Sequence, residues 1–327
     1  MIHFLRQHRI LKILAIVILS LAFIILAVPY LVPLADNPPG VPLETLVSDN
    51  GKFLNIENCR IYVEEEGPLS SPEAVVFLHG FGGSTFSWRN STPFFASKGY
   101  RVLSLDMKGF GLSTKDFESD YSHRSQAKII AAVLDRLHIG HIYLVGHSMG
   151  TSVMLHFAHL YPEKVLGLVS VDGAVILETG SRLPSKLLSF GPFQRAGRVF
   201  LTHYLTKDRF QAILESAYYR KDVVSPEVVD GYYNRAVIGN WDQSLLAMTR
   251  DMSQNVISFP LESIKSSTLI IRGENDTWVT RADMDRWKDR IPNAEFYPVP
   301  ECGHLPMEER PELFNERILT FFNSLKS

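Results

Sequence analysis

Apolar residues gather in one long block near the N-terminus, where no charged residue occurs between Ile13 and Leu34. A basic residue, Lys12, precedes the block and an acidic one, Asp36, follows it closely. An uninterrupted apolar run of about 20 residues is long enough to cross the hydrocarbon core of a bilayer as a helix. We therefore expect residues 1–35 to form an N-terminal tail and a transmembrane anchor.

The charges on the two sides of this run predict its orientation. Short segments rich in Lys and Arg remain in the cytoplasm. We expect a single-pass membrane protein with a cytoplasmic N-terminus and a catalytic domain on the extracytoplasmic side. The alternative is a cleaved signal peptide, which the basic start would suit, although no good small-residue cleavage site follows the run. Residues 36–50 are rich in Pro, Gly and Asp and indicate a linker.

Beyond residue 50, short apolar runs alternate with helical periodicity. Residues 52–65 alternate apolar and polar positions and predict an antiparallel hairpin. Continuous apolar runs then predict strands at Ala74–Leu78, Tyr100–Leu105, Ile142–Val145, Val165–Val171, Thr268–Ile271 and Glu295–Val299. Helical patterns lie between or after these runs at 126–137, 149–160, 281–290 and 311–325. Such an alternation predicts an α/β fold with a mostly parallel, doubly wound sheet covered by helices on both faces.

One connection between the predicted strands is far longer than the others. The chain between Asp172 and Thr268 greatly exceeds the roughly 2–6 residues usual between a helix and a strand. Its apolar residues recur at helical spacing, as at Phe210, Leu214 and Ala217. We expect a helical cap at residues 174–263, inserted into a sheet domain made of residues 51–173 and 264–327.

Composition and charge exclude several classes of protein. The 327 residues carry a formal net charge of -2, which excludes a generally basic nucleic-acid-binding protein. Hydrophobic residues make up 46% of the chain, which excludes a mostly disordered protein. The two cysteines, Cys59 and Cys302, are too few for a disulfide scaffold or a zinc ribbon.

The clearest chemical signal is the sequence Gly146-His-Ser-Met-Gly150, between a predicted strand and a predicted helix. A G-x-S-x-G motif in this context is typical of a nucleophile elbow, a tight turn that the glycines allow to close. Ser148 is thus the predicted nucleophile. The backbone N–H of Met149 is expected to point into the site at the start of the helix. His147 lies inside the elbow and is expected to point away from the serine.

A serine nucleophile needs a base and a carboxylate that orients the base. His304 follows the last predicted strand, in a loop that opens toward the crevice of a doubly wound sheet. Asp276 directly follows another predicted strand. The order Ser148, Asp276, His304 is one of the known orders of a Ser-His-Asp triad. Asp172, which also ends a strand, is the second candidate for the acid.

An oxyanion hole needs backbone N–H groups close to the substrate. The stretch His79-Gly-Phe-Gly-Gly83 follows a predicted strand, and its glycines permit a close approach of the backbone. We expect the N–H groups of Phe81 and Met149 to be the donors and His79 to be structural. Substrate contacts are expected at Gly80, Gly82, Trp88 and Trp241.

From about residue 52 to 325 the chain resembles the α/β-hydrolase superfamily. The matching pieces, besides the Asp276 and Gly303-His304 loops, are His79–Gly83, Asp106–Ser113, Gly146–Gly150 and Tyr161–Val165. The stretches Phe86–Arg89 and Asp106–Ser113 most resemble the capped branch with epoxide hydrolases, haloalkane dehalogenases, haloperoxidases and C–C hydrolases. The epoxide hydrolases and dehalogenases of that branch have an aspartate where this chain has Ser148, so neither activity is expected. The anchor, elbow and cap together resemble membrane-anchored monoacylglycerol lipases.

The resemblance and the triad together imply a serine hydrolase that cleaves lipid-like or other apolar carboxylic esters through an acyl-enzyme. No metal and no organic cofactor is expected. The expected partners are the ester or lipid substrate and a membrane, bound through the N-terminal helix, with no nucleic acid. The alternatives are a cofactor-free C–C hydrolase or perhydrolase with the same triad, and a non-catalytic ligand-binding receptor with a hydrolase fold. Acyl chain length, head group and oligomeric state are not readable from the sequence.

Overall fold

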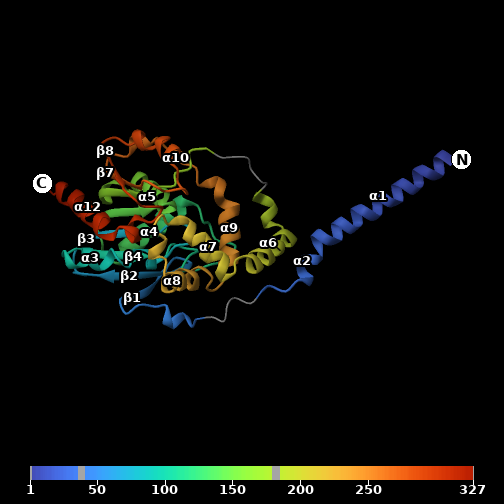
Figure 1. Cartoon of the computed structure of the whole chain (residues 1–327), viewed down its shortest axis with the longest axis horizontal. Coiled ribbons are helices and arrows are strands. Elements are labelled where there is room, and N and C mark those ends of the chain that lie inside the picture. Colours follow the sequence, from blue (N-terminus) through green and yellow to red (C-terminus); the bar gives the residue numbers. More distant parts are fainter. Residues whose placement is uncertain (1, 36–40, 179–184, 327) are drawn as a thin grey trace.

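A computed structural model describes residues 2–35, 41–178 and 185–326 of the chain (Figure 1). Eight strands form one sheet in the order β1-β2-β4-β3-β5-β6-β7-β8. Their bounds are β1 Gly51–Ile56, β2 Cys59–Glu66, β3 Glu73–Leu78, β4 Arg101–Leu105, β5 His141–His147, β6 Val165–Val171, β7 Thr268–Gly273 and β8 Ala294–Val299. The strands β1 and β2 form an antiparallel hairpin, and β2 runs antiparallel to β4. The remaining neighbours in the sheet, β4–β3, β3–β5, β5–β6, β6–β7 and β7–β8, are all parallel. This confirms the predicted, mostly parallel sheet.

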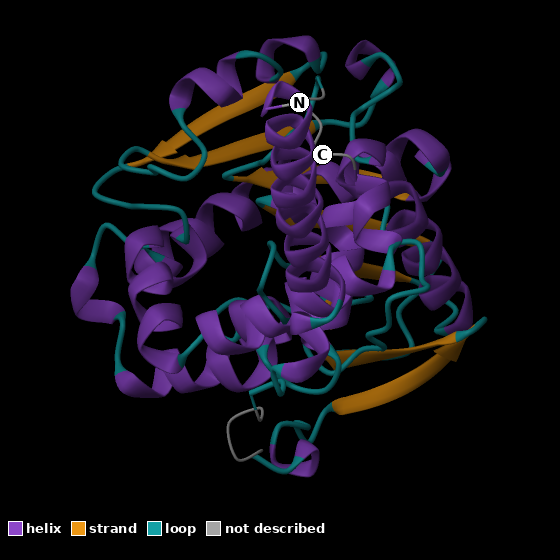
Figure 2. Cartoon of the chain, turned by 90° about the vertical axis from the view of Figure 1, so that its right-hand side faces the viewer, coloured by secondary structure: helices purple, strands orange, loops and turns teal. Residues whose placement is uncertain are grey.

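The central strands are apolar on both faces because helices cover both sides of the sheet (Figure 2). In β3, Val76 belongs to one buried apolar cluster, whereas its neighbours Val75 and Phe77 belong to a second cluster on the opposite face. This explains why β3 is a continuous apolar run and does not alternate with polar residues. The helices of the sheet domain are α3 Thr92–Ser97, α4 His123–Arg136, α5 Met149–Leu160, α10 Arg281–Asp285, α11 Pro306–Glu309 and α12 Pro311–Ser324.

The helix predicted at 281–290 is shorter in the structure. It begins with a capping box at Thr280 and Asp283 but ends at Asp285, and a single 3₁₀ turn follows at Lys288–Arg290. Between the two lies Trp287, whose side chain is buried and whose backbone, with φ -133° and ψ -28°, departs from helical geometry. Burial of this large ring in the sheet domain therefore takes precedence over continuation of the helix.

Helices also fill the long connection between β6 and β7. Their bounds are α6 Gly191–Tyr204, α7 Lys207–Ala217, α8 Pro226–Ala236 and α9 Trp241–Asp251. Side-chain caps start two of them, because Thr206 accepts the N–H of Arg209 and Ser225 accepts the N–H of Val228. We use the word cap for residues 174–263, of which 179–184 lie outside the described residues.

The N-terminal apolar run does not form one continuous helix. Helix α1 (Ile2–Leu26) extends away from the body, and a short second helix, α2 (Val28–Leu31), follows it (Figure 1). In α2, Pro29 is buried, and Arg195 of α6 donates hydrogen bonds to the carbonyl oxygens of Pro29 at 3.1 Å and Val32 at 3.0 Å. The end of the predicted anchor is therefore part of the contact with the cap.

The predicted transmembrane anchor at Ile13–Leu34 is wrong, and so is the single-pass membrane location that rested on it. Within the described part of the chain, the structure has no helix that combines the length and the apolar character needed to cross a membrane. The charge-free part of α1 runs only from Ile13 to Leu26. At ~1.5 Å per residue this stretch is about 21 Å long, which is less than the ~30 Å of a hydrocarbon core.

The predicted linker at 36–50 is only partly within the described residues, which resume at residue 41. In that later part, Leu46 is buried against Tyr62 and Leu112, and the backbone N–H of Ser48 donates to the Tyr62 hydroxyl at 2.9 Å. The chain is thus already packed on the sheet before β1.

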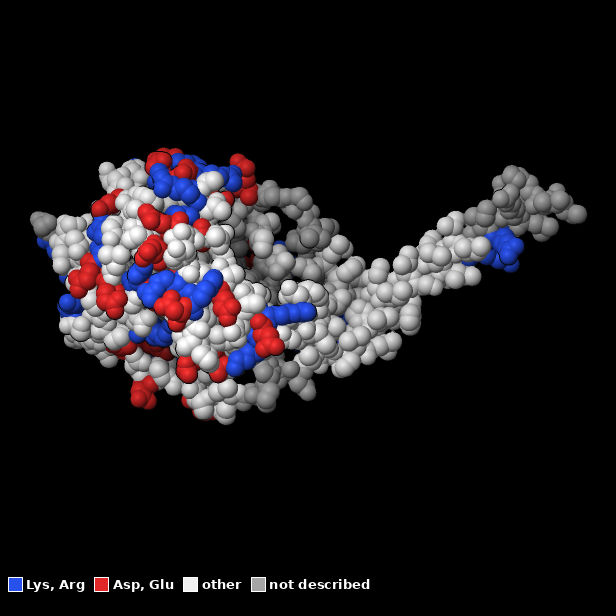
Figure 3. Space-filling model, viewed as in Figure 1, with Lys and Arg blue, Asp and Glu red and all other residues white. Residues whose placement is uncertain are grey.

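Over the visible face of the body, acidic and basic side chains are intermixed, whereas most of the described side chains along α1 are uncharged (Figure 3).

Candidate active site

Ser148 lies in a strained turn between β5 and α5. Its backbone has φ 50° and ψ -117°, a region that non-glycine residues rarely adopt. A Cβ atom at Gly146 would lie 2.5 Å from the carbonyl oxygen of Gly150, and one at Gly150 would lie 2.5 Å from that of Leu78. The turn therefore requires glycine on both sides of the serine. The N–H of Ser148 donates to the carbonyl of Val171 at 2.8 Å, which holds the turn against β6.

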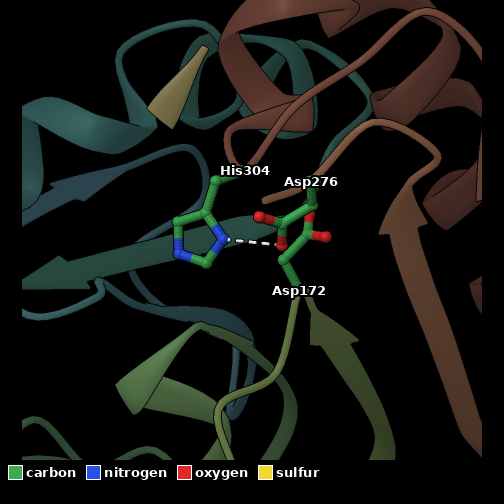
Figure 4. Close-up of side chains that lie close together, drawn as sticks. All are labelled: Asp172, Asp276 and His304. Atoms are coloured by element: carbon green, nitrogen blue, oxygen red, sulfur yellow. Dashed lines mark hydrogen bonds and ion pairs between the residues drawn. The ribbon is translucent and has the colours of Figure 1, made fainter. Parts of the chain in front are cut away.

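His304 and Asp276 form a buried hydrogen-bonded pair. The Nδ1 atom of His304 lies 2.8 Å from Oδ2 of Asp276 (Figure 4). The other carboxylate oxygen, Oδ1, accepts the backbone N–H groups of Trp278 at 2.7 Å and Val279 at 3.1 Å. Burial by itself would raise the pKa of Asp276, but the hydrogen bond and the charge of His304 and the backbone donors hold it below its ordinary value. Asp276 is thus built to remain a carboxylate beside the imidazole.

The backbone of His304 is held from two directions. Its N–H donates to the carbonyl of Ala217, at the end of the cap helix α7, at 2.8 Å. Its carbonyl oxygen lies 2.8 Å from Nε2 of His147. Burial, followed by the proximity of His304, lowers the pKa of His147 to about 3, so His147 is neutral and donates through Nε2. The sequence predicts only that His147 points away from Ser148, whereas its contact with the carbonyl oxygen of His304 shows that it anchors the loop of His304.

Asp172, the second candidate for the acid, lies beside this pair at the end of β6. It is completely buried, and it accepts the N–H of Gly273 at 3.0 Å. The hydrogen bond to His304 is made by Asp276. Ligand atoms of Asp172, Asp276 and His304 all lie within 4.8 Å of one another. Because the His304–Asp276 contact is a direct hydrogen bond, we assign no metal ion to this group.

The loop after β3 carries the predicted oxyanion donor Phe81 and lies against the elbow. A Cβ atom at Gly80 would lie 2.8 Å from the His147 ring and 3.0 Å from the Cβ of Ser148. Gly82 has a φ of +73°, which glycine adopts without strain. The glycines of this loop thus allow its backbone to lie directly beside Ser148.

His79 fixes the conformation of the same loop. Its Nδ1 lies 2.7 Å from the carbonyl oxygen of Gly80, and its Nε2 accepts the N–H of Met107 at 3.0 Å. Burial lowers the pKa of His79 to about 4, so the ring is neutral, with its proton on Nδ1. This agrees with the structural role expected from the sequence.

A pocket of about 410 Å³ connects these groups. Ser148 and His304 both line it, together with residues of the β3 loop and the cap. Of the predicted substrate contacts, Gly80, Gly82 and Trp241 line the pocket, as does Phe81. The predicted donor Met149 occupies the first position of α5, directly after the serine.

Trp88 does not line this pocket, and the expectation that it contacts substrate is not supported. Its side chain is fully buried in the core of the sheet domain. The ring lies 4.7 Å from that of Phe77 in β3, centroid to centroid. Trp88 is close in sequence to the β3 loop, but the sequence does not show that a 3₁₀ turn, Thr85–Trp88, directs its side chain into the core.

The pocket wall is apolar beyond the end that Ser148 and His304 line. None of the described residues that line it is Asp, Glu, Lys or Arg. Its hydroxyl groups are already hydrogen-bonded within the protein: Ser244 to the carbonyls of Gly109 at 2.9 Å and Trp241 at 3.0 Å, and Tyr232 to Ser87 at 3.0 Å. Such a wall suits the hydrocarbon part of a ligand.

Comparisons with known proteins agree with this architecture. The family model described as alpha/beta hydrolase fold matches residues 73–311. An uncharacterized hydrolase, YugF of Bacillus subtilis (strain 168), is 29% identical over 81% of this chain and 95% of its own length. A 2-hydroxy-6-oxononadienedioate/2-hydroxy-6-oxononatrienedioate hydrolase of Burkholderia vietnamiensis (strain G4 / LMG 22486) is also 29% identical, over 84% of this chain and 96% of its own. The solved structure of Est816, an N-acyl homoserine lactone degrading enzyme, is 26% identical with a TM-score of 0.68, over 83% of this chain and 100% of that one.

Proposed function

The chain belongs to the α/β hydrolase fold family, and from that premise we propose that it is a serine hydrolase of uncharged, apolar carboxylic esters. The observation that carries the proposal is the buried His304–Asp276 hydrogen bond of 2.8 Å at the end of a pocket that Ser148 also lines. A nucleophile, a base and an orienting acid in this arrangement are the parts that acyl transfer to serine requires.

In the proposed reaction, the hydroxyl oxygen of Ser148 attacks the ester carbonyl carbon while His304 takes its proton. The negative charge that develops on the carbonyl oxygen is stabilised by the N–H groups of Phe81 and Met149, each of which contributes roughly 3–4 kcal/mol. The C–O bond to the alcohol then breaks, and His304 donates its proton to the leaving oxygen. Water attacks the acyl-enzyme by the same steps, and the carboxylic acid is released.

In this proposal Asp276 keeps the imidazole in the productive tautomer. Its carboxylate accepts a hydrogen bond from Nδ1–H, so that the unprotonated Nε2 is free to act as the base toward Ser148. It also stabilises the imidazolium that forms after proton transfer. The backbone donors of Trp278 and Val279 keep the carboxylate in place during both steps.

The pocket argues for an uncharged substrate. Its volume of about 410 Å³ falls within the range of about 300–1,000 Å³ usual for small-molecule sites. A carboxylate placed in an apolar wall without a cationic partner loses its hydration and gains nothing in return. We therefore propose an acyl ester whose hydrocarbon part lies between the β3 loop and the cap.

A second candidate, C–C bond hydrolysis by the same triad, is favoured by the name of the Burkholderia vietnamiensis relative. The substrate in that name is a dioate, which carries two carboxylates. The described residues that line the pocket include no Lys or Arg to bind them. Ester hydrolysis therefore remains the better proposal. A non-catalytic receptor is disfavoured because a ligand-binding pocket alone does not require the His304–Asp276 pair.

The proposal is tested by Ser148→Ala. We expect this variant to lose labelling by a fluorophosphonate and to lose turnover of p-nitrophenyl esters by roughly 10⁴-fold or more. The matched control is Ser87→Ala, which removes another hydroxyl from the same pocket and should retain labelling. Full labelling of Ser148→Ala would exclude Ser148 as the nucleophile. Faster cleavage of a dienedioate than of any ester in a chain-length series would favour the second candidate.

A further inference from the structure

Two carboxyl groups meet beside the base, although the proposed mechanism uses only one. Asp172 directly follows β6 and Asp276 follows β7, and these strands are neighbours in the sheet. Asp172 is completely buried and Asp276 is 5% exposed. Figure 4 shows the two carboxyl groups facing each other next to the His304 ring. Ligand atoms of the three side chains lie within 4.8 Å of one another.

The two carboxyl groups have different numbers of hydrogen-bond donors. Asp276 accepts one N–H from His304 and two from the backbone, at Trp278 and Val279. Within the described residues, the donor to Asp172 is the N–H of Gly273, at 3.0 Å to one oxygen and 3.4 Å to the other. Donors to a carboxylate stabilise its charged form. The negative charge is therefore better supported on Asp276 than on Asp172.

The surrounding ionisable groups do not compensate a second negative charge. Arg272 attracts Asp172 electrostatically, but its guanidinium donates to the backbone carbonyls of Glu274 at 3.2 Å, Asp276 at 3.0 Å and Val279 at 3.4 Å. The thiol of Cys302, which also faces this group, has a pKa raised by burial and is neutral. Among the ion pairs of the described residues, none includes Asp172.

Two carboxylates in contact cannot both remain ionised without compensation, so one of them keeps a proton. Burial raises the pKa of Asp172 well above its ordinary value, and the charge of Asp276 raises it further. The pKa of Asp276, in contrast, lies below its ordinary value despite its burial. Both directions agree with the difference in donors.

We propose that Asp172 is a positioning residue that carries a proton and donates a hydrogen bond to the Asp276 carboxylate. Two carboxyl groups then present a single negative charge to His304. This bond restrains rotation of the Asp276 carboxylate and keeps its Oδ2 atom directed at the imidazole. The inference rests on the proposed function, because it gives Asp172 a role in orienting the triad.

Asparagine is the natural test residue at position 172. The backbone of Asp172 has a φ of +42°, a left-handed conformation that Asp and Asn tolerate better than other non-glycine residues. Asp172→Asn keeps the shape and a hydrogen-bond donor but cannot carry a charge. Asp172→Ala removes the donor. The exposed residue Asp289 pairs with Lys288, and neither residue lines the pocket, so Asp289→Asn provides the control.

The experiment measures kcat and KM of the full chain for a p-nitrophenyl ester between about pH 5 and 9, the range over which histidine changes its charge. We expect Asp172→Asn to match the wild type within about 3-fold, with the acid limb of its pH profile unmoved. We expect Asp172→Ala to lose roughly 10-fold or more in kcat with little change in KM, because one hydrogen bond to a charged group is lost. Asp289→Asn should change neither parameter.

Two results would overturn the inference. If Asp172 is ionised, Asp172→Asn removes a negative charge near His304 and moves the acid limb down by about 1–3 pH units. If Asp172→Ala is as active as the wild type, or Asp172→Asn as impaired as Asp172→Ala, the donated bond has no positioning role. Should Asp172→Ala fail to fold, the pH profile of Asp172→Asn still decides the protonation state. Failure of the proposed function is recognised separately, by labelling of Ser148→Ala.

Discussion

Glu308 is a buried carboxylate that joins the cap to the sheet domain. It lies in α11, close after His304, and its side chain is 2% exposed. It forms an ion pair with Arg89 and accepts the hydroxyl of Tyr218 at 2.7 Å and that of Tyr232. Both tyrosines belong to the cap, whereas Arg89 belongs to the sheet domain. The carboxylate of Glu308 thus accepts hydrogen bonds from both the cap and the sheet domain.

We predict that Glu308→Ala is strongly destabilising. The substitution leaves the hydroxyls of Tyr218 and Tyr232 without their carboxylate partner, although Tyr232 keeps its hydrogen bond with Ser87. The Arg89 guanidinium loses its ion pair but keeps its hydrogen bond to the carbonyl of Phe86 and its place over the Phe86 ring. Loss of one partner from a buried ion pair costs about 3–5 kcal/mol of the free energy of unfolding. For 327 residues the unfolding entropy is about 0.7 kcal/mol per kelvin, so Tm should fall by about 4–7 °C.

Thermal unfolding of the full chain, followed by calorimetry, measures this shift. The control is Glu262→Ala, which removes an ion pair with Arg290 in which both side chains are about half exposed. An exposed pair of this kind contributes little to stability, so Tm of the control should fall by much less than that of Glu308→Ala. Equal Tm values for Glu308→Ala and Glu262→Ala would refute the reasoning, because a buried acceptor with these partners cannot be as dispensable as an exposed one.

Two further predictions concern the elbow and the buried histidines. Gly150→Ala should abolish ester turnover and lower Tm, because the added Cβ would lie 2.5 Å from the carbonyl oxygen of Leu78. The control is Gly140→Ala, whose added Cβ would have its nearest neighbour at 3.7 Å and which should leave turnover unchanged in the same assay. Burial lowers the pKa of His123 to about 3, so the unfolded chain binds the extra proton and stability is lost as the pH falls from about 6.5 to about 3. Urea unfolding across this range should show a shallower pH dependence of stability for His123→Leu than for the wild type. Identical slopes for the two proteins would contradict this assignment.

The sequence predicts most of the sheet and the identity of the candidate site residues because both depend on local patterns. Continuous apolar runs mark the buried strands, and the strand–turn–helix context of Ser148 marks the elbow. The same patterns place Asp172 and Asp276 at the ends of neighbouring strands but do not decide between them. That choice depends on which carboxylate reaches Nδ1 of His304, a distance that no spacing along the chain encodes.

The errors have the same origin. The apolar composition of Ile13–Leu34 shows that the segment lacks charged residues. It does not predict where the helix ends or which residues bury its end. The helix ends at Leu26, and burial of Pro29 against the cap depends on Arg195, which is remote in sequence. Trp88 is likewise close in sequence to the β3 loop, and only the packing of its ring on Phe77 shows that it belongs to the core.

The strand order also has a consequence for the synthesis of the protein. The segments that form the elbow and the β3 loop all precede the cap in the chain, and they lie beside the paired strands β3, β5 and β6. The strands β7 and β8 follow the cap, so they can join the edge of the sheet only after the whole cap has been translated. The loops after these two strands carry Asp276 and His304. Parallel pairings between remote segments are slow to form, and a growing chain folds from its N-terminal side first. Ser148 is therefore expected to reach its turn before His304, its proposed base, joins the fold, so that a chain terminated within the cap would carry the elbow but lack Asp276 and His304.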